Sequence, residues 1–227
     1  MRYDNICDGV FISRPNRFVA LAEIDGAETL CHVKNTGRLG ELLIPGVALV
    51  IQRVNSSGRK TSHDLIGVKT EKGYVNIDSQ APNKLFEEWL LKGLGPIRPA
   101  EIKREHRYLS SRLDFLITGE GGERHLVETK GVTLIENGVA LFPDAPTERG
   151  VRHLEHLAQA ASDGFVSWAV FIVKADFAHG FSPNEEKHPG FAQALRSAQK
   201  SGVNVLALSC DVTREGIFVR EPLPVML

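Results

Sequence analysis

Two acidic side chains and one lysine in the middle of the chain have the types and spacing of a divalent-metal site. Glu128 and Lys130 are two apart in a run rich in Leu, Val and Thr, and side chains two apart on a β-strand point to the same face. The segment Tyr108–Ile117 is the expected partner strand, since the glycines of TGEGGE suit a reversing turn between them. A turn centred on Gly121 places Asp114 opposite Glu128, whereas a shift of one residue sends the two carboxylates to opposite faces.

These three residue types suit phosphodiester hydrolysis. Two neighbouring carboxylates repel each other unless a cation lies between them or water solvates both. Mg²⁺ or Mn²⁺ is the expected metal, held by Asp114 and Glu128, because hard cations take carboxylate and phosphate oxygens. Lys130 would complete the catalytic trio by orienting a metal-bound water and offsetting charge on phosphorus. The alternative is that all three residues decorate the solvated face of an antiparallel hairpin.

Several segments, in the expected order along the chain, resemble the sugar fermentation stimulation protein A family. They are NRFVALAEI at 16–24, NTGRL at 35–39, LIPG at 43–46, APNKLFEEWL at 81–90, SRLDF at 111–115, VETKGVTLIENG at 127–138, FPDAPTERGVRHLEHL at 142–157 and the terminal PLPVML. The resemblance implies an OB-like β-barrel followed by an α/β domain with a mixed sheet similar to PD-(D/E)xK nucleases. It also implies DNA binding, with a regulatory link to sugar metabolism, and it places Asp114, Glu128 and Lys130 on the nuclease motif.

Local sequence patterns predict the same two-part organisation. Five strand-like runs, at about 10–24, 29–33, 48–54, 64–70 and 74–77, suit a small barrel. An apolar helical stretch begins at Pro82, so we place one domain at 1–81 and a second at 82–227. In the second domain Thr147 is the expected N-cap of a helix over 148–161. A helical segment also lies between apolar runs at 168–175 and 203–210, which predicts a crossover connection in a mixed sheet.

Any nucleic-acid surface on this chain must be local, because 27 Lys and Arg face 28 Asp and Glu and the net charge is −1. The alternative for each basic patch is a solvated loop. Phe11 and Phe18 are the aromatic side chains near basic residues in the barrel, where a strand phenylalanine more often packs in the core. The candidate nucleic-acid-binding residues are Arg14, Arg17, Lys34, Asn35, Arg38, Arg59, Lys60, Lys103, Arg104 and Arg107.

Four further residues are predicted to support the site. Glu88 lies on the early helix, where nuclease-like folds often carry another acid, although a surface glutamate would look the same. Arg149 shares a helical face with His153 and could contact a phosphate, or it could pair with Asp144 or Glu148. Glu148, beside Arg149, is the third, and Arg112, close to Asp114 in sequence, is the fourth. We set aside a metal site at the H-x-x-H of residues 153–156, since neither a metalloprotease glutamate nor nearby cysteines accompany it.

Composition excludes several other classes. No apolar run approaches the roughly 20 residues of a membrane-spanning helix, and the first residues lack the apolar core of a secretion signal, so we expect a cytoplasmic protein without a membrane partner. Three cysteines without a C-x-x-C argue against a disulfide framework or a structural zinc. Three functions remain: a DNA-binding protein with a nuclease-like metal site, which we favour; a Mg²⁺-dependent nuclease; and a non-catalytic regulator that uses the fold as a scaffold.

Overall fold

The computed structural model describes residues 1–54, 58 and 61–227, so the predicted contacts of Arg59 and Lys60 lie outside the described residues. The chain forms two compact units. The N-terminal unit comprises Met1–Ala81, Lys174–Phe177 and Cys210–Phe218, and the C-terminal unit comprises Pro82–Val173, Ala178–Ser209 and Val219–Leu227. Within the described residues, every helix is too short or too polar to cross a membrane.

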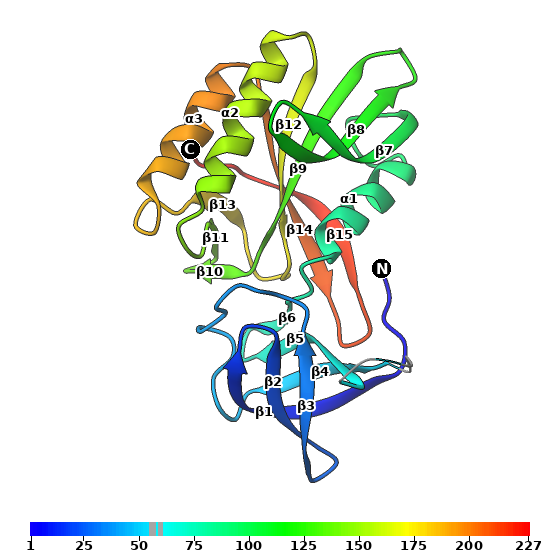
Figure 1. Cartoon of the computed structure of the whole chain (residues 1–227), viewed down its shortest axis with the longest axis vertical. Coiled ribbons are helices and arrows are strands. Elements are labelled where there is room, and N and C mark those ends of the chain that lie inside the picture. Colours follow the sequence, from blue (N-terminus) through cyan, green and yellow to red (C-terminus); the bar gives the residue numbers. More distant parts are fainter. Residues whose placement is uncertain (55–57, 59–60) are drawn as a thin grey trace. The chain divides into compact units, whose positions relative to one another are not determined.

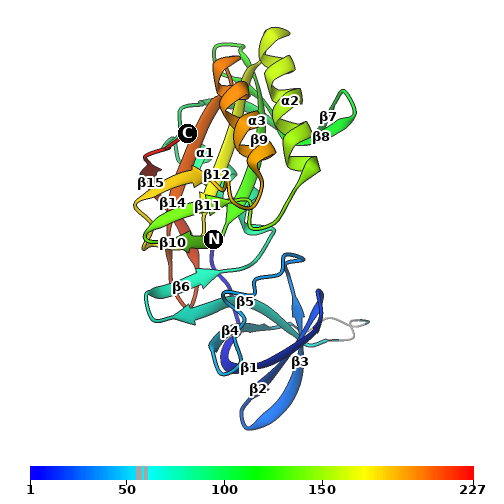
Figure 2. The ribbon, with the colours of Figure 1, turned by 90° about the vertical axis from the view of Figure 1, so that its left-hand side faces the viewer.

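The N-terminal unit is a closed five-stranded barrel, as predicted. Its strands are β1 (Ile6–Asn16), β2 (Val19–Ile24), β3 (Ala27–Val33), β4 (Ala48–Arg53) and β5 (His63–Thr70). They pair in the order β3-β2-β1-β4-β5, and a parallel pairing of β3 with β5 closes the barrel. This is the strand order of an OB-like fold, and the curled strands are visible in Figure 2.

Two of the predicted strand runs are assigned differently in the structure. The run at 10–24 is two strands joined by a tight turn, in which Asn16 Oδ1 accepts a hydrogen bond from the Phe18 N–H at 2.9 Å. The Pro15-Asn16 pair and the polar residues beside it are a turn signal inside this run. The run at 74–77 belongs to β6 (Gly73–Asn76), which pairs with β5 at the edge of the barrel sheet instead of closing the barrel.

Two segments from late in the sequence complete the N-terminal unit. The Arg214 guanidinium forms a bidentate ion pair with Asp8, at 2.8 and 3.0 Å. The Lys174 ammonium is 1% exposed and donates to the Asp78 carbonyl at 3.1 Å. Tyr3 adds a backbone hydrogen bond to the carbonyl of Glu215 at 2.9 Å. The predicted single boundary between residues 81 and 82 therefore leaves out two later segments that belong to the N-terminal unit.

The C-terminal unit is built on a mixed sheet, as predicted. The strands are β7 (Pro99–Tyr108), β8 (Ser111–Gly119), β9 (Arg124–Val132), β12 (Val166–Val173), β14 (Asn204–Val212) and β15 (Ile217–Leu223), in the order β15-β14-β12-β9-β8-β7. Strands β9, β12 and β14 are parallel, whereas β7, β8 and β9 are antiparallel. A small second sheet contains β10 (Leu134–Glu136), β11 (Val139–Phe142) and β13 (Gly180–Pro183).

Helices cover both faces of this sheet. Helices α2 (Glu148–Ser162) and α3 (Pro189–Lys200) lie side by side on one face, and α1 (Ala81–Leu91) lies on the other (Figure 1). Phe86 of α1 packs its ring against Phe115 of β8 at 5.8 Å between centroids. Thr147 caps α2 as predicted, since its side chain accepts from the Gly150 N–H at 3.1 Å.

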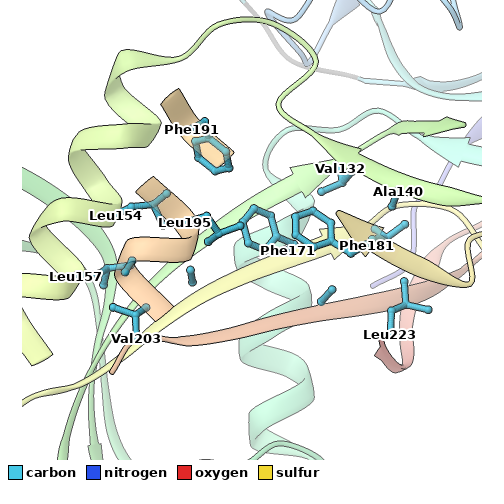
Figure 3. Packing of buried hydrophobic residues seen from close by; sticks show 14 of the residues in the cluster. Val132, Ala140, Leu154, Leu157, Phe171, Phe181, Phe191, Leu195, Val203 and Leu223 are labelled. Atoms are coloured by element: carbon cyan, nitrogen blue, oxygen red, sulfur yellow. The ribbon is translucent and has the colours of Figure 1, made fainter. Parts of the chain in front are cut away.

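The apolar core beneath α2 and α3 centres on Phe171 of β12, which is 1% exposed. Figure 3 shows its ring beside that of Phe181, with Phe191 and Leu195 of α3 nearby. The ring centroids of Phe171 and Phe181 are 4.1 Å apart, and Phe142 lies 5.6 Å from Phe171. This cluster fixes α2 and α3 on the sheet.

Replacing Phe171 with alanine should destabilise the C-terminal unit by about 3–5 kcal/mol, because it removes ring contacts and leaves a cavity. The only two tryptophans, Trp89 and Trp168, both belong to this unit, so urea unfolding followed by tryptophan fluorescence reports on it. Leu91→Ala is the control, since Leu91 is 67% exposed and its loss should change stability by less than about 0.5 kcal/mol. Similar midpoints for the two variants would contradict this account of the core.

Candidate metal centre

The β8–β9 hairpin has the register expected for a turn centred on Gly121. Pairing runs from Thr118↔Arg124 to Phe115↔Val127. Asp114 and Glu128 occupy the next position, just beyond the last pair of the ladder. The register therefore brings the two acidic residues to the same level of the sheet.

The Asp114 carboxylate is bound by residues from two elements. It accepts from the Thr129 N–H at 2.8 Å and from the Thr129 hydroxyl at 2.9 Å. On its other oxygen it accepts from the Asn83 side-chain amide at 3.0 Å, and Asn83 lies in the first turn of α1. These contacts tie Asp114 to the residue beside Glu128 and fix its orientation.

Glu128 is 5% exposed and has two cationic or donor partners on a single oxygen. Its Oε1 contacts the Lys130 ammonium, and the His153 Nδ1 of α2 lies 2.5 Å from the same atom. The Nε2 of His153 accepts from the Arg149 Nε–H at 3.3 Å. Because a guanidinium only donates, the His153 proton is assigned to Nδ1, from which it is donated to Glu128.

The two carboxyl groups have pKa values displaced in opposite directions. Burial, together with the negative charge of Glu128, raises the pKa of Asp114 against the hydrogen bonds from Thr129 and Asn83. Burial also acts to raise the pKa of Glu128, but the hydrogen bond from His153 and the charge of Lys130 outweigh it, so this pKa is lowered. The surroundings thus favour the ionised form of Glu128 and disfavour that of Asp114, relative to the free side chains.

The arrangement suits a hard divalent cation. Glu128 Oε2 is buried and has no hydrogen-bond partner among the described residues, which is costly for a carboxylate oxygen. A cation between Glu128 Oε2 and Asp114 would satisfy that atom and relieve the repulsion that raises the Asp114 pKa. The described residues contain no group of three or more His, Cys, Asp or Glu side chains arranged for a metal. Water, backbone or phosphate oxygens would have to complete the shell, which is common for Mg²⁺.

Several predicted nucleic-acid contacts in the barrel are engaged in structural roles. Arg14 donates to the carbonyl oxygens of Gly37, Arg38, Arg17 and Asn35, so its guanidinium fixes the loop after β3. The side chain of Asn35 donates to the Ile77 carbonyl at 3.0 Å and accepts from the Gly37 N–H at 2.8 Å.

The other barrel candidates differ in their exposure. Lys34 is 18% exposed at its side chain and pairs with Asp78 at 2.8 Å. Arg17 and Arg38 are exposed. The guanidinium of Arg17 lies over the Phe18 ring, 4.8 Å from its centroid. Phe11 is buried, as expected for a strand phenylalanine, whereas Phe18 is 45% exposed.

The basic candidates of the second domain lie on the β7–β8 hairpin, where β7 is an edge of the sheet. Lys103 pairs with Glu101 at 3.2 Å, and Arg104 contacts Glu87 of α1. Arg107 is exposed and stands in register with Arg112, which pairs with Glu105 at 3.3 Å.

The remaining supporting residues lie on helices. Glu88 is half-buried on α1. Glu148 is 82% exposed at its side chain and lies 3.4 Å from His188. Arg149 donates to His153, and the phosphate contact foreseen for it stays a prediction.

Three residues of the site escaped the sequence analysis. His153 was considered as half of an H-x-x-H pair and as a neighbour of Arg149, but its contact with Glu128 was not foreseen. Asn83 and Thr129 are neutral side chains in ordinary helix and strand contexts, and nothing in their local pattern indicates that they bind Asp114. The one available signal was the four-residue spacing of Arg149 and His153, which does place them together.

An OB-like barrel joined to a mixed α/β domain, with paired carboxylates beside a lysine, defines a two-domain protein with a candidate metal site. Comparison with known families identifies it further. Residues 12–77 match the SfsA N-terminal OB domain, and residues 80–216 match the sugar fermentation stimulation protein RE domain. The chain belongs to the sugar fermentation stimulation protein A family.

Individual relatives agree along nearly the full length. The chain is 52% identical over 218 residues to a sugar fermentation stimulation protein homolog of Desulfitobacterium hafniense, covering 96% of this chain and 94% of that protein. It is 47% identical to the homolog of Ruminiclostridium cellulolyticum, covering 100% of both. A solved structure of Pyrococcus furiosus SfsA has 34% identity and a TM-score of 0.89, covering 100% of this chain and 98% of that one.

Replacing Asp114 with asparagine should raise the melting temperature in EDTA, by an amount worth roughly 0.5–2 kcal/mol. A carboxyl whose pKa is raised in the folded state is destabilised there as an anion, and the neutral isostere removes that cost. The Asn oxygen can still accept from the Thr129 N–H. Asp144→Asn, at an exposed loop position, is the control and should leave the melting temperature unchanged in calorimetry. A lower melting temperature for Asp114→Asn would overturn the proposed repulsion.

Proposed function

We propose that this protein binds DNA and holds a divalent cation, Mg²⁺ or Mn²⁺, between Asp114 and Glu128 at the bound phosphate. One observation carries the proposal: two buried or half-buried carboxylates meet at the end of one strand pair, and Glu128 Oε2 lacks a partner among the described residues. Lys130 balances only part of this negative charge, because its ammonium contacts Oε1.

The Pyrococcus furiosus relative supports the metal. Its structure is described as a complex with Ca²⁺. Calcium and magnesium are both hard cations that take oxygen ligands, although Mg²⁺ prefers a smaller octahedral shell and keeps more water. A carboxylate pair that leaves several positions to water favours Mg²⁺ or Mn²⁺ for the present site.

The β7–β8 hairpin supports DNA as the partner. Arg107 and Arg112 stand directly opposite each other, and like charges in register destabilise a strand pair. Arg112 also lies two residues before Asp114 on β8, which puts it on the same strand face. A phosphate bound by these arginines would neutralise both and would lie toward the metal pair.

Hydrolysis of the bound phosphodiester is the second candidate, favoured by the position of Lys130. A bound Mg²⁺ would polarise the phosphoryl oxygens and acidify a coordinated water. Lys130 would hold a positive charge beside the reacting phosphate, and His153 would keep Glu128 ionised and correctly oriented. Regulation of sugar metabolism, which the names of the relatives suggest, requires only the binding function.

Mn²⁺ should bind the wild-type protein, and Asp114→Ala should abolish most of that binding, because the substitution removes one of two ligands. Titration calorimetry on protein freed of metal with EDTA measures both affinities. Asp144→Ala is the matched control, since it removes an exposed carboxylate of the same unit and should bind like wild type. Indistinguishable titrations of wild type and Asp114→Ala would refute the metal site.

Affinity for DNA should fall as salt rises, since a chain of net charge −1 depends on local arginines that displace counterions. Arg107→Ala should lower the slope of log affinity against log salt by about one. Arg196→Ala is the control, because Arg196, on α3, is already paired with Glu185. Fluorescence anisotropy of a labelled DNA gives the slopes, and its length after incubation with Mn²⁺ distinguishes binding from hydrolysis. An affinity independent of salt would exclude phosphate contacts as its source.

A further inference from the structure

A pocket of about 550 Å³ opens on the outside of the barrel. Its volume lies within the range of sites that bind small organic groups. All its lining residues belong to the N-terminal unit, and they combine one aromatic, one aliphatic and several polar side chains. The residues that matter for the argument are Phe18, Val19, His32, Lys34, Asp64 and Gln80.

The floor of this pocket is formed by residues of three adjacent strands that are paired with one another. Val19 of β2 pairs with His32 of β3, and His32 pairs with Asp64 of β5. Register partners project from the same side of a sheet. Cys31 and Val33 on either side of His32 are buried in the barrel, so the His32 side chain projects outward. The floor is therefore a fixed row of β-strand side chains.

Phe18 supplies an exposed aromatic surface at the edge of this row. Its backbone is held at both ends, by the Phe18 N–H to Asn16 Oδ1 at 2.9 Å and by the Val33 N–H to the Phe18 carbonyl at 2.8 Å. The ring is 45% exposed even though the Arg17 guanidinium lies 4.8 Å from its centroid. An exposed ring on an anchored backbone, with an arginine guanidinium over it, is a platform on which a flat heteroaromatic group can stack.

The polar lining fits the edge of a nucleobase better than it fits a phosphate. Asp64 is 4% exposed and brings a carboxylate to the floor, and Asp78 neutralises Lys34 at 2.8 Å. His32 Nδ1 lies 3.4 Å from Asp64 Oδ1 and has no hydrogen-bond partner among the described residues. Acceptors and donors side by side match the mixed edges of bases, whereas a carboxylate repels phosphate.

We propose that this pocket receives an unpaired base of single-stranded DNA, stacked on Phe18, with Arg17 positioned to meet the adjoining phosphate. The proposal rests on the DNA-binding function and specifies its strand form. Duplex DNA keeps its bases stacked and paired, so it cannot fill the pocket without extruding one of them. The barrel thus adds a preference for single strands.

The test compares a non-self-complementary single-stranded 12-mer with its duplex, using anisotropy on the full chain. Phe18→Ala should weaken single-strand binding about tenfold or more, the loss expected for one base–aromatic stack, and should leave duplex binding unchanged. Ile44→Ala, another exposed apolar residue of the same unit, should bind both forms like wild type. Phe18→Trp should retain single-strand affinity, and its added indole should be quenched by the 12-mer.

The possible results separate the two proposals. If wild type binds DNA and Phe18→Ala binds the single strand equally well, the pocket proposal is overturned and the DNA-binding function stands. An equal loss on duplex, or an unquenched indole in Phe18→Trp, also overturns it. Failure of wild type to bind either form overturns the DNA-binding function itself. If free dAMP displaces the 12-mer and binds with the same affinity, the pocket takes free nucleotides. This result would overturn the single-strand assignment.

Discussion

The burial of the Glu128 carboxylate is the constraint around which the polar groups of the C-terminal unit are arranged. A carboxylate removed from water costs several kcal/mol unless charges and donors replace its hydration. Lys130 supplies positive charge from the same strand, and His153 of α2 donates a hydrogen bond. Arg149 fixes the tautomer of His153 that can donate it. Helix α2 is in turn held by Leu157 in the apolar core. Core packing and the chemistry of Glu128 are therefore coupled, because a displaced α2 would leave the carboxylate without its second partner.

Each of the two candidate sites contains a group in an energetically unfavourable environment. At the carboxylate pair, Glu128 Oε2 is left without a donor among the described residues, and Asp114 is held against like charge. On the barrel, Phe18 exposes a large apolar ring. Natural sequences tolerate such costs mainly where a ligand compensates them. These two features are the ones on which the proposed cation site and the proposed base pocket rest.

Sequence reasoning succeeded where the determining information was local. Side-chain alternation and the turn at Gly121 were enough to predict the register of Asp114 and Glu128, and the cap at Thr147 followed from residue type. It failed where tertiary contacts decide. The direction in which His153 faces depends on how α2 rotates against a sheet whose strands lie far away in sequence. Counting charges likewise could not reveal that Arg14 binds backbone carbonyls. The turn after Asn16 was missed because the run at 10–24 was predicted as one strand in spite of the polar residues and Pro15 within it.

The interleaving of the two units has a consequence for how the protein is made. The barrel strands end by residue 76, yet the N-terminal unit includes Lys174–Phe177 and Cys210–Phe218. During synthesis the strands can pair early. The ion pair of Asp8 with Arg214 and the hydrogen bond of the Asp78 carbonyl with Lys174 form only after those later residues have been made. Because chains grow at about 5–20 residues per second, the barrel spends many seconds with these groups solvated. The N-terminal unit therefore acquires these contacts only after Lys174 and Arg214 have been synthesised, so its final stability depends on segments that follow most of the second unit in the sequence.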